Sequence, residues 1–308
     1  MLINVASQLF RECFSSDPHP FVSDGFIELN KNKVDQIVRL IVENGTNSIG
    51  LVGGIKNNTL KSPFSAPFGG FHFNTSESFI DEILIFLNLL KEYVIENNLQ
   101  KVEITLPPDI YHHSVNTKFI NAFIRSGYTM ATPEITNWID LTLFDGTFTK
   151  REVMKNYRKA IINQLTIENV SEDAMKAKAL DIIAVNRKLF DRPMYLTFAD
   201  LTETGKVIPI DFFLVRDNNN SEVGSAIFYR GHSDIIQGTF WADTEVGRSI
   251  RSMDFLALNL FNYYKKLGFK YIDLGTSSVA GIPNQGLVRF KEIHNCTSAL
   301  RFSFIWSR

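Results

Sequence analysis

Three charged residues near the C-terminus have the types and spacing that acyl-transfer chemistry uses. Asp273 lies inside the short apolar segment YIDLG at 271–275, and Arg289 and Lys291 stand on either side of Phe290. A lysine beside a developing negative charge stabilises the oxyanion of a tetrahedral intermediate, and a carboxylate directed at an amine or hydroxyl acts as a base. We predict Lys291 and Asp273 as catalytic residues and Arg289 as a substrate-binding residue. The structural alternative makes Asp273 a hydrogen-bonded buried acid and the two cations an exposed pair around a core aromatic ring.

A second group of residues has the character of a substrate-binding surface. The segment SPFSAPFGGF at 62–71 combines two prolines, two adjacent glycines and three phenylalanines. Gly69 and Gly70 would let a ligand approach the backbone, and Phe68 would form a wall of the pocket. The alternative is a rigid, proline-set turn that closes the core of its domain. Asn284, in the loop that follows YIDLG, is a candidate to hydrogen-bond the backbone of the donor.

A basic stripe marks the helix predicted over 150–163. Arg151, Lys155 and Arg158 fall on one face of that helix, with Lys159 beside them. Such a stripe could bind a phosphate or carboxylate of an acceptor, and we predict Arg158 as the binding residue. The alternative is a solvated surface, which is the more common role of a charge run on one helix face.

The elements that must position these residues are readable in the last third of the chain. Two strands are predicted at 222–230 and 234–241, followed by a helix over 248–267 and a strand at 270–275. The helix has apolar residues at spacings of three and four and ends at Gly268, a residue that favours the left-handed conformation. Strand–helix–strand in this order is the crossover unit of a parallel strand pair.

The first half of the chain repeats this order. A strand at 48–55, a helix at 78–97 and a strand at 101–106 precede their counterparts in the last third by a nearly constant offset. We interpret the repeat as an internal duplication of one unit, with coincidence in a two-domain chain as the alternative. The predicted class is α+β, with layered helices and sheets in two tandem domains.

The predicted join between the two copies lies near residue 148. A strand at 137–144 is followed by a turn, and Thr149 with Glu152 has the spacing of a capping box that opens the next helix. The predicted domains are therefore 1–148 and 149–308.

Bulk composition restricts the class of protein. The net charge of −1 over 308 residues implies no general attraction to DNA. No apolar run approaches the roughly 20 residues of a membrane span, so we expect no stable membrane insertion. Two cysteines and no signal-peptide pattern favour a cytoplasmic protein. The adjacent pair His112 and His113 has poor spacing for a metal, and we predict no metal site.

Three segments together resemble the FemAB-like branch of the GNAT acyltransferase superfamily. YIDLG followed by GLVRFKEI resembles its C-terminal domain, SPFSAPFGGF a loop of its N-terminal domain, and KNYRKAI at 155–161 the basic helix that opens its second domain. The resemblance covers most of residues 20–305. It implies two GNAT-like domains, each a mixed twisted sheet flanked by helices, and places Lys291 near the acceptor or the reacting centre.

The sequence departs from acetyl-CoA-dependent GNAT enzymes at the turn before the long helix. Those enzymes carry Q/R-x-x-G-x-G/A there, and its backbone N–H groups hold the pyrophosphate. Here Thr244, Gly247 and Ser249 occupy the turn, which keeps one glycine and adds the acidic Glu245. Acyl-CoA therefore remains a candidate donor that this turn disfavours.

The resemblance implies transfer of an acyl or aminoacyl group to an amine or hydroxyl of a cell-envelope or polysaccharide precursor. Characterised members of the branch take aminoacyl groups from tRNA, so aminoacyl-tRNA is a candidate partner. The alternative from another class is a non-catalytic binding protein that keeps the duplicated fold and has lost donor binding.

Overall fold

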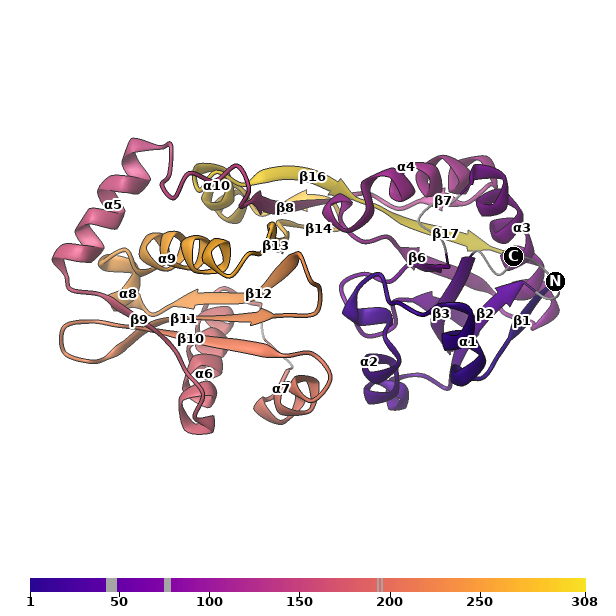
Figure 1. The fold of residues 1–308 in the computed structure, drawn as a ribbon, viewed down its shortest axis with the longest axis horizontal. Helices are drawn as coiled ribbons and strands as arrows, with labels where there is room; N and C mark the ends of the chain where they lie inside the picture. Colours follow the sequence, from indigo (N-terminus) through magenta and orange to yellow (C-terminus); the bar gives the residue numbers. More distant parts are fainter. Residues whose placement is uncertain (43–48, 75–78, 193, 195) are drawn as a thin grey trace. The chain divides into compact units, whose positions relative to one another are not determined.

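The structure is a computed structural model that describes residues 1–42, 49–74, 79–192, 194 and 196–308 (Figure 1). The chain divides into two compact units. Unit 1 comprises Met1–Ile135, Ser278–Ile282 and Ala299–Arg308, and unit 2 comprises Thr136–Ser277 and Pro283–Ser298.

Unit 1 contains an eight-stranded mixed sheet. The strands run in the order β1-β2-β3-β4-β6-β17-β7, with β5 also paired to β3. Only β4 and β6 pair in parallel among the described pairs of this sheet. The strands are β1 (Leu2–Asn4), β2 (Gln36–Val42), β3 (Ile49–Lys56), β4 (Thr59–Ser62), β5 (Phe71–Phe73), β6 (Lys101–Thr105), β7 (Thr129–Met130) and β17 (Ser303–Ser307).

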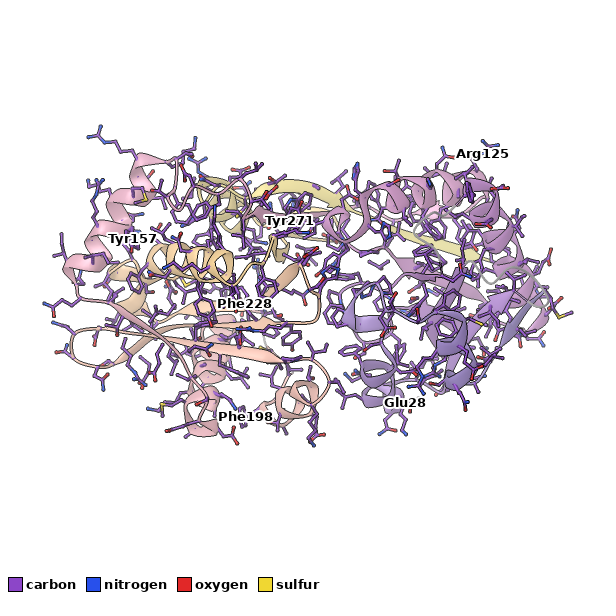
Figure 2. The ribbon with its side chains drawn as sticks, in the orientation of Figure 1. Glu28, Arg125, Tyr157, Phe198, Phe228 and Tyr271 are labelled. Atoms are coloured by element: carbon purple, nitrogen blue, oxygen red, sulfur yellow. The ribbon has the colours of Figure 1, made fainter. Side chains whose placement is uncertain are left out.

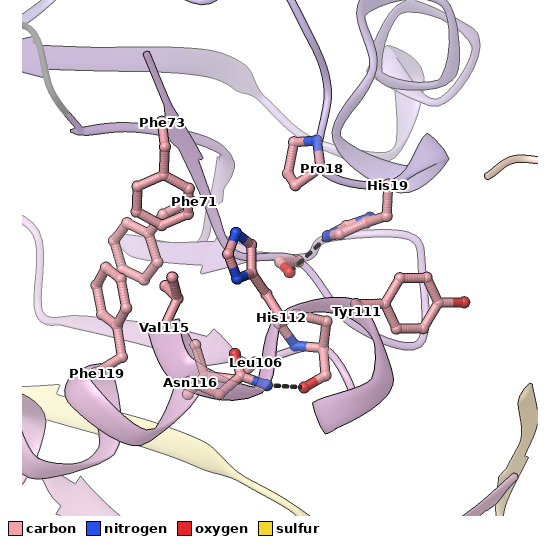
Figure 3. A pocket seen from close by; sticks show the side chains of 12 residues that line it. Pro18, His19, Phe71, Phe73, Leu106, Tyr111, His112, Val115, Asn116 and Phe119 are labelled. Carbon is pink, nitrogen blue, oxygen red and sulfur yellow. Dashed lines mark hydrogen bonds between the residues drawn. The ribbon is translucent and has the colours of Figure 1, made fainter. Parts of the chain in front are cut away.

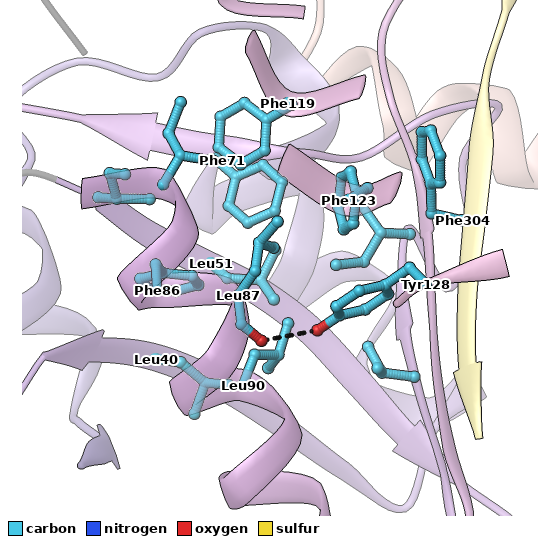
Figure 4. Close-up of a cluster of buried hydrophobic side chains, with 14 of the residues drawn as sticks. Leu40, Leu51, Phe71, Phe86, Leu87, Leu90, Phe119, Phe123, Tyr128 and Phe304 are labelled. Atoms are coloured by element: carbon cyan, nitrogen blue, oxygen red, sulfur yellow. Dashed lines mark hydrogen bonds between the residues drawn. The ribbon is translucent and has the colours of Figure 1, made fainter. Parts of the chain in front are cut away.

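Long helices α3 (Ile80–Glu96) and α4 (Asp109–Arg125) supply much of the core of unit 1, and the shorter α1 (Ser7–Cys13) and α2 (Asp24–Leu29) complete it. Phe71 stacks on Phe119 with ring centroids 4.0 Å apart (Figure 4). The hydroxyl of Tyr128 donates to the backbone oxygen of Leu87, so the buried phenol is satisfied where it packs.

Unit 2 contains a seven-stranded mixed sheet. Its order is β16-β8-β13-β12-β11-β10-β9, and β12 pairs with β13 in parallel. The strands are β8 (Glu134–Asp140), β9 (Thr166–Asn169), β10 (Ile210–Arg216), β11 (Glu222–Tyr229), β12 (Ile235–Asp243), β13 (Tyr271–Thr276) and β16 (Thr297–Arg301). A small pair, β14 (Ser278–Val279) and β15 (Ile282–Pro283), stands outside both sheets.

Helices cover both faces of the unit 2 sheet (Figure 1). On one face, Ser225 of β11 donates to the backbone oxygen of Ala179 in α6. On the other, Phe228 of β11 packs against Tyr264 of α9 with ring centroids 4.8 Å apart (Figure 2). Tyr157 of α5 stacks on the outer side of α9. The helices are α5 (Arg151–Ile162), α6 (Asp173–Leu189), α7 (Phe198–Gly205), α8 (Glu245–Ser249), α9 (Ser252–Lys266) and α10 (Gln285–Ile293).

The two sheets repeat one topology. The series β2-β3-β4-β6-β17 in unit 1 corresponds to β10-β11-β12-β13-β8 in unit 2, and α3 and α9 each connect a parallel pair. The predicted fold class, two tandem mixed α/β layers, is confirmed. One strand departs from simple tandem order, because β8 follows unit 1 in sequence and pairs in unit 2, whereas β17 follows unit 2 and pairs in unit 1.

This exchange is why the units do not divide at the predicted join near residue 148. Ile139 of β8 pairs with Ile272 of β13, so the chain enters unit 2 at Thr136. Phe304 of β17 pairs with Ile104 of β6, which places the C-terminal residues in unit 1.

Two local predictions are wrong. The capping box at Thr149 and Glu152 does not form, because the Thr149 hydroxyl bonds to Asn295 Oδ1 at 2.9 Å and α5 begins after Lys150 without a side-chain cap. The helix predicted over 248–267 is two helices, α8 and α9, because Arg251 between them adopts a left-handed conformation with φ of 70°. Gly268 ends α9 in a left-handed conformation, as predicted. The first residue of the strand predicted at 48–55 and of the helix predicted at 78–97 lies outside the described residues.

Candidate active site

The main candidate site is a cavity of about 780 Å³ in unit 2. Strands β12 and β13 pair over a short stretch, in which Ile235–Gln237 of β12 lie beside Tyr271–Asp273 of β13. Beyond that point β12 continues to Asp243, and both strands line the cavity where they separate.

Each of the two strands carries an extra residue at this point. Thr239 is unpaired where the β11–β12 register shifts, and β13 has one residue more than β8 between Asp273 and Thr276. Gly275, within the second bulge, has a φ of 67° that glycine adopts without strain. Bulges bend a strand and increase its twist, so the paired irregularities open the parallel pair into the cavity.

Lys291 of α10 holds the bulged end of β13. Its ammonium donates to the backbone oxygens of Leu274, Gly275 and Thr276 at 2.8, 2.9 and 3.3 Å. Burial lowers the pKa of Lys291 to about 8, and the Cys296 thiol and the Asp273 carboxylate oppose this shift. Lys291 lines the cavity, but backbone oxygens accept from all three of its N–H donors. Its main role in this geometry is to hold the bulged end of β13 in place.

Asp273 lies in the sheet behind this tether. Its side chain is 1% exposed, and Oδ1 accepts a hydrogen bond from the N–H of Gly275 at 2.8 Å. It is absent from the described residues that line the cavity. This position suits a structural acid that supports the bulge, while its catalytic role stays a prediction.

Asn284 is the N-terminal cap of α10 and lines the cavity. In one orientation its side-chain oxygen accepts from the N–H of Leu287 at 3.4 Å. With the amide turned, the oxygen instead accepts from both terminal nitrogens of Arg192. The side chain of Asn284 can therefore bond either the N-terminal end of α10 or the guanidinium of Arg192, which also lines the cavity.

The structure does not bring the other two predicted cations of unit 2 to the cavity. Arg289 is exposed on α10, where its nearest described acid is Glu292 at 3.9 Å. Arg158 is exposed on α5, and its neighbour Lys159 donates to the backbone oxygen of Ser249 at 3.0 Å. Neither arginine is among the described lining residues of the cavity.

The predicted binding segment of unit 1 is tightly packed. Phe68 is 1% exposed and contacts the rings of His19 and Tyr111, each with centroids 4.9 Å apart. The N–H of Gly69 donates to the backbone oxygen of Thr105, and the backbone oxygen of Gly69 accepts from Nε2 of His19 at 2.9 Å (Figure 3).

Space in this part of unit 1 is small. An added Cβ at Gly69 would lie 2.5 Å from Oγ of Ser62, and Gly70 has a φ of 129°. The adjacent cavity measures about 20 Å³, room for about one water molecule. The segment has the geometry of a sealed turn, and substrate binding by Phe68, Gly69 and Gly70 stays a prediction.

The turn that holds pyrophosphate in acetyl-CoA-dependent GNAT enzymes is closed here. The N–H of Gly247 donates to Oγ1 of Thr244 at 3.1 Å. A Cβ at Gly247 would lie 1.9 Å from the backbone oxygen of Val223, so glycine is needed for the turn to pack on β11. Ser249 donates its hydroxyl to the backbone oxygen of Val246. The Gly247 amide and the Ser249 hydroxyl are thus engaged within the turn, and acyl-CoA as the donor stays a prediction that this turn disfavours.

Charged residues that no motif had singled out surround the cavity. Arg187 and Arg192 come from the end of α6 and the loop after it, and Arg248 and Arg251 come from α8 and the α8–α9 junction. Arg248 pairs with Asp243 at 3.1 Å; burial raises the pKa of Asp243 and Arg248 partly offsets the shift. Arg187 and Arg192 lie far from Arg248 and Arg251 in sequence, so no local spacing signal could have grouped the two pairs.

A buried contact between a histidine and a carboxylate lies beside Lys291. His294 Nε2 is 3.2 Å from Asp254 Oδ1, and Nδ1 donates to the backbone oxygen of Phe290 at 2.6 Å. The Nε2–Oδ1 contact does not have the geometry of a hydrogen bond.

Two findings concern metals and membranes. Within the described residues, no group of three or more His, Cys, Asp or Glu side chains is placed to hold a metal ion. No helix in the described part of the chain is long and apolar enough to cross a membrane.

Solved structures share this architecture across nearly the whole chain. FemX matches with a TM-score of 0.69 at 12% identity, covering 100% of this chain and 97% of that one. The C-terminal domain of a putative lysylphosphatidylglycerol synthetase from Agrobacterium fabrum matches with a TM-score of 0.59 at 12% identity, covering 97% and 92%. A tandem GNAT protein from the clavulanic acid biosynthesis pathway matches with a TM-score of 0.54 at 8% identity, covering 88% and 83%.

No family model matches the sequence, and no curated protein matches it. The structural matches show that the chain has the tandem GNAT fold of FemAB-like proteins, as the sequence motifs predicted.

Proposed function

We propose that the protein transfers an acyl or aminoacyl group to an amine or hydroxyl of a cell-envelope or polysaccharide precursor. The observation that carries this proposal is the cavity between β12 and β13. Beyond Gln237 the edge of β12 is no longer paired with β13, and unpaired strand edges bind extended chains through backbone hydrogen bonds. An extended acyl or aminoacyl donor would fit along this edge.

The chemistry we propose is direct attack. The acceptor amine or hydroxyl attacks the donor carbonyl, the carbonyl oxygen becomes an oxyanion, and the donor's thiol or hydroxyl leaves as the new amide or ester forms. Backbone N–H groups along the cavity would stabilise the oxyanion, and the positive charge of Lys291 would add to that stabilisation. Lys291 would also keep β13 in the bulged conformation that the cavity requires, so catalysis would rest mainly on positioning.

The structural matches support an envelope-related acceptor. One matched protein is by its name a synthetase of lysylphosphatidylglycerol, an aminoacylated phospholipid. We propose a precursor of comparable chemistry as the acceptor here, and a reaction in the cytoplasm, where activated donors are made. Aminoacyl-tRNA is the donor that a closed pyrophosphate turn favours over acyl-CoA. The exposed basic residues Arg151, Lys155 and Arg158 of α5 would then contact its phosphates.

A non-catalytic binding protein is the second candidate function. The specific observation that favours it is the saturation of Lys291 by three backbone oxygens, which leaves its ammonium without a free donor. Such a protein would keep the cavity and bind a donor-like or precursor-like molecule without turning it over.

Calorimetry and a transfer assay separate these functions. The purified full chain is titrated with a panel of acyl-CoAs and with aminoacyl-tRNAs, and each donor is then incubated with nucleotide-linked precursors and amine acceptors. A new amide or ester product detected by mass spectrometry is the expected result. Binding without product would favour the non-catalytic function, and absence of binding to every donor would refute the transferase proposal.

A further inference from the structure

We propose that Arg187, Arg192 and Arg251 form an anion site at the solvent edge of the unit 2 cavity, which binds a phosphate ester of the donor. This inference rests on the proposed function, because it names the group by which the donor is held. The three guanidinium groups would replace the backbone amides of the closed turn at Thr244–Ser249.

The other charges around the cavity already have partners. Arg248 is paired with Asp243, and Asp254 Oδ1 lies 3.2 Å from Nε2 of His294. The ammonium of Lys291 donates its three hydrogen bonds to backbone oxygens. The carboxylates among the described lining residues are Asp243 and Asp254, and neither lies within ion-pair distance of Arg187, Arg192 or Arg251.

Three arginines remain with their charge uncompensated. Among the residues that the structure describes, no carboxylate lies within ion-pair distance of Arg187, Arg192 or Arg251. Arg192 and Arg251 are exposed and Arg187 is half-buried, which places the charges at the boundary between the cavity and solvent. The whole chain carries a net charge of −1, so this excess of positive charge is local. A cavity lined by one sign of charge concentrates ligands of the opposite sign.

Two of the arginines are held together by the backbone after α6. Nε of Arg187 donates to the backbone oxygen of Arg192 at 3.1 Å, and the N–H of Arg192 donates back to the oxygen of Arg187 at 2.8 Å. The guanidinium of Arg187 also lies over the ring of Phe240, 5.9 Å from its centroid. Burial lowers the pKa of Arg187 and the charge of Arg192 lowers it further, a cost that a bound anion would relieve.

Arg251 reaches the cavity from a strained backbone. Its φ of 70° lies in the left-handed region, which costs a residue with a side chain about 1 kcal/mol or more. Glycine would adopt this conformation without cost. An arginine at such a position is consistent with a use for its side chain.

The ligand that fits three guanidinium groups is a phosphate ester or pyrophosphate. Guanidinium groups bind phosphate through paired N–H donors, and several of them together match a group of higher charge than a carboxylate. Both coenzyme A and the 3′ end of a tRNA carry such phosphates. The shared chemistry is the phosphate, and the source is decided by experiment.

The test is calorimetric titration of the full chain with inorganic pyrophosphate at low ionic strength. The double variant R187Q/R192Q should weaken the Kd about tenfold or more, because it removes two charge-assisted contacts. R251G should weaken it several-fold while the melting temperature stays equal or rises, since the left-handed strain is removed. The matched control is K188Q, an exposed cation on the same helix that does not line the cavity.

Each outcome decides the inference. Equal Kd values for wild type and R187Q/R192Q, or no pyrophosphate binding by wild type at millimolar concentration, would overturn it. Parallel titrations with coenzyme A and with 5′-phosphorylated CCA trinucleotide identify the source, since the true donor should share the sensitivity to R187Q/R192Q. Because pyrophosphate binding requires no turnover, it can succeed where the transferase proposal fails, and turnover can persist where the anion site fails.

Discussion

At the residue scale, the role of Lys291 depends on its hydrogen-bond partners. A lysine after a YIDLG segment predicts an available cation near a reacting carbonyl. In the structure its ammonium is bound by three backbone oxygens of the β13 bulge. Lys291 would therefore act on the reaction largely through the strand that it holds, which changes what its removal should do.

Replacing Lys291 with methionine should destabilise the protein by about 2–4 kcal/mol, because three buried carbonyl groups lose their donor. Urea denaturation of the full chain, monitored by Trp fluorescence, measures the change in the free energy of unfolding. The matched control is Lys188→Met, an exposed cation on α6, where the change should stay within about 0.5 kcal/mol. Equal stability of the wild type and the Lys291 variant would show that the tether is not structural.

The same side chain makes stability depend on pH. Burial lowers the pKa of Lys291 from 10.5 to about 8 in the folded protein. Between these values the unfolded chain binds the proton and the folded chain does not, so the free energy of unfolding rises with pH. We expect the difference in that free energy between wild type and Lys291→Met to grow from about pH 8 to pH 10.5. Denaturation series at several pH values measure it, and a constant difference would contradict the assignment.

At the element scale, Gly247 in the turn at Thr244–Ser249 has a different structural role from the glycine of the GNAT pattern. In the GNAT pattern a glycine here frees the backbone for pyrophosphate. In this protein Gly247 is needed because the turn packs directly on the backbone oxygen of Val223. The turn is therefore part of the sheet packing, and phosphate recognition must come from other residues.

Gly247→Ala should cost about 2–3 kcal/mol, since its Cβ would meet rigid backbone at 1.9 Å. Gly205→Ala at the end of α7 is the control, because its Cβ would meet only Cδ1 of Ile210 at 4.0 Å. The control should be neutral or slightly stabilising. Thermal unfolding of both variants measures the contrast, and similar melting temperatures would show that the turn relaxes to admit a side chain.

At the scale of the whole molecule, the exchange of β8 and β17 links the stability of each unit to a distant part of the chain. Phe304 of β17 is fully buried in the core of unit 1 and stacks on Phe123 with ring centroids 4.5 Å apart (Figure 4). The C-terminal residues are thus required by a unit that is built mostly from the first half of the chain.

Phe304→Ala should destabilise unit 1 by about 3–5 kcal/mol through the cavity it leaves. Amide hydrogen exchange in α4 and β6 reports the loss, and those elements should lose protection first. Leu300, which is 46% exposed, is the control, and Leu300→Ala should change stability by less than about 0.5 kcal/mol. Unchanged protection in β6 after Phe304→Ala would contradict the dependence of unit 1 on β17.

The sequence by itself determined the elements and their repetition. Apolar spacing predicted α9 and β13, and the matching order of elements predicted two copies of one α/β unit, because periodicity is a local property of the chain. The same reasoning could not detect the left-handed Arg251 that separates α8 from α9. It also placed the join between the domains near residue 148, whereas unit 2 begins at Thr136. The exchange of β8 and β17 depends on pairing between residues that are far apart in sequence, which local periodicity does not report.

Only the tertiary structure decided what the charged residues do. Lys291 and Asp273 were visible as a motif, but their partners are backbone groups that the bulge of β13 presents to them. Arg187, Arg192 and Arg251 carried no motif and became a group only where α6 and the α8–α9 junction line one cavity. The physical reason is that a charge acquires its role from the groups within hydrogen-bond distance, and the long-range packing of the fold chooses those groups.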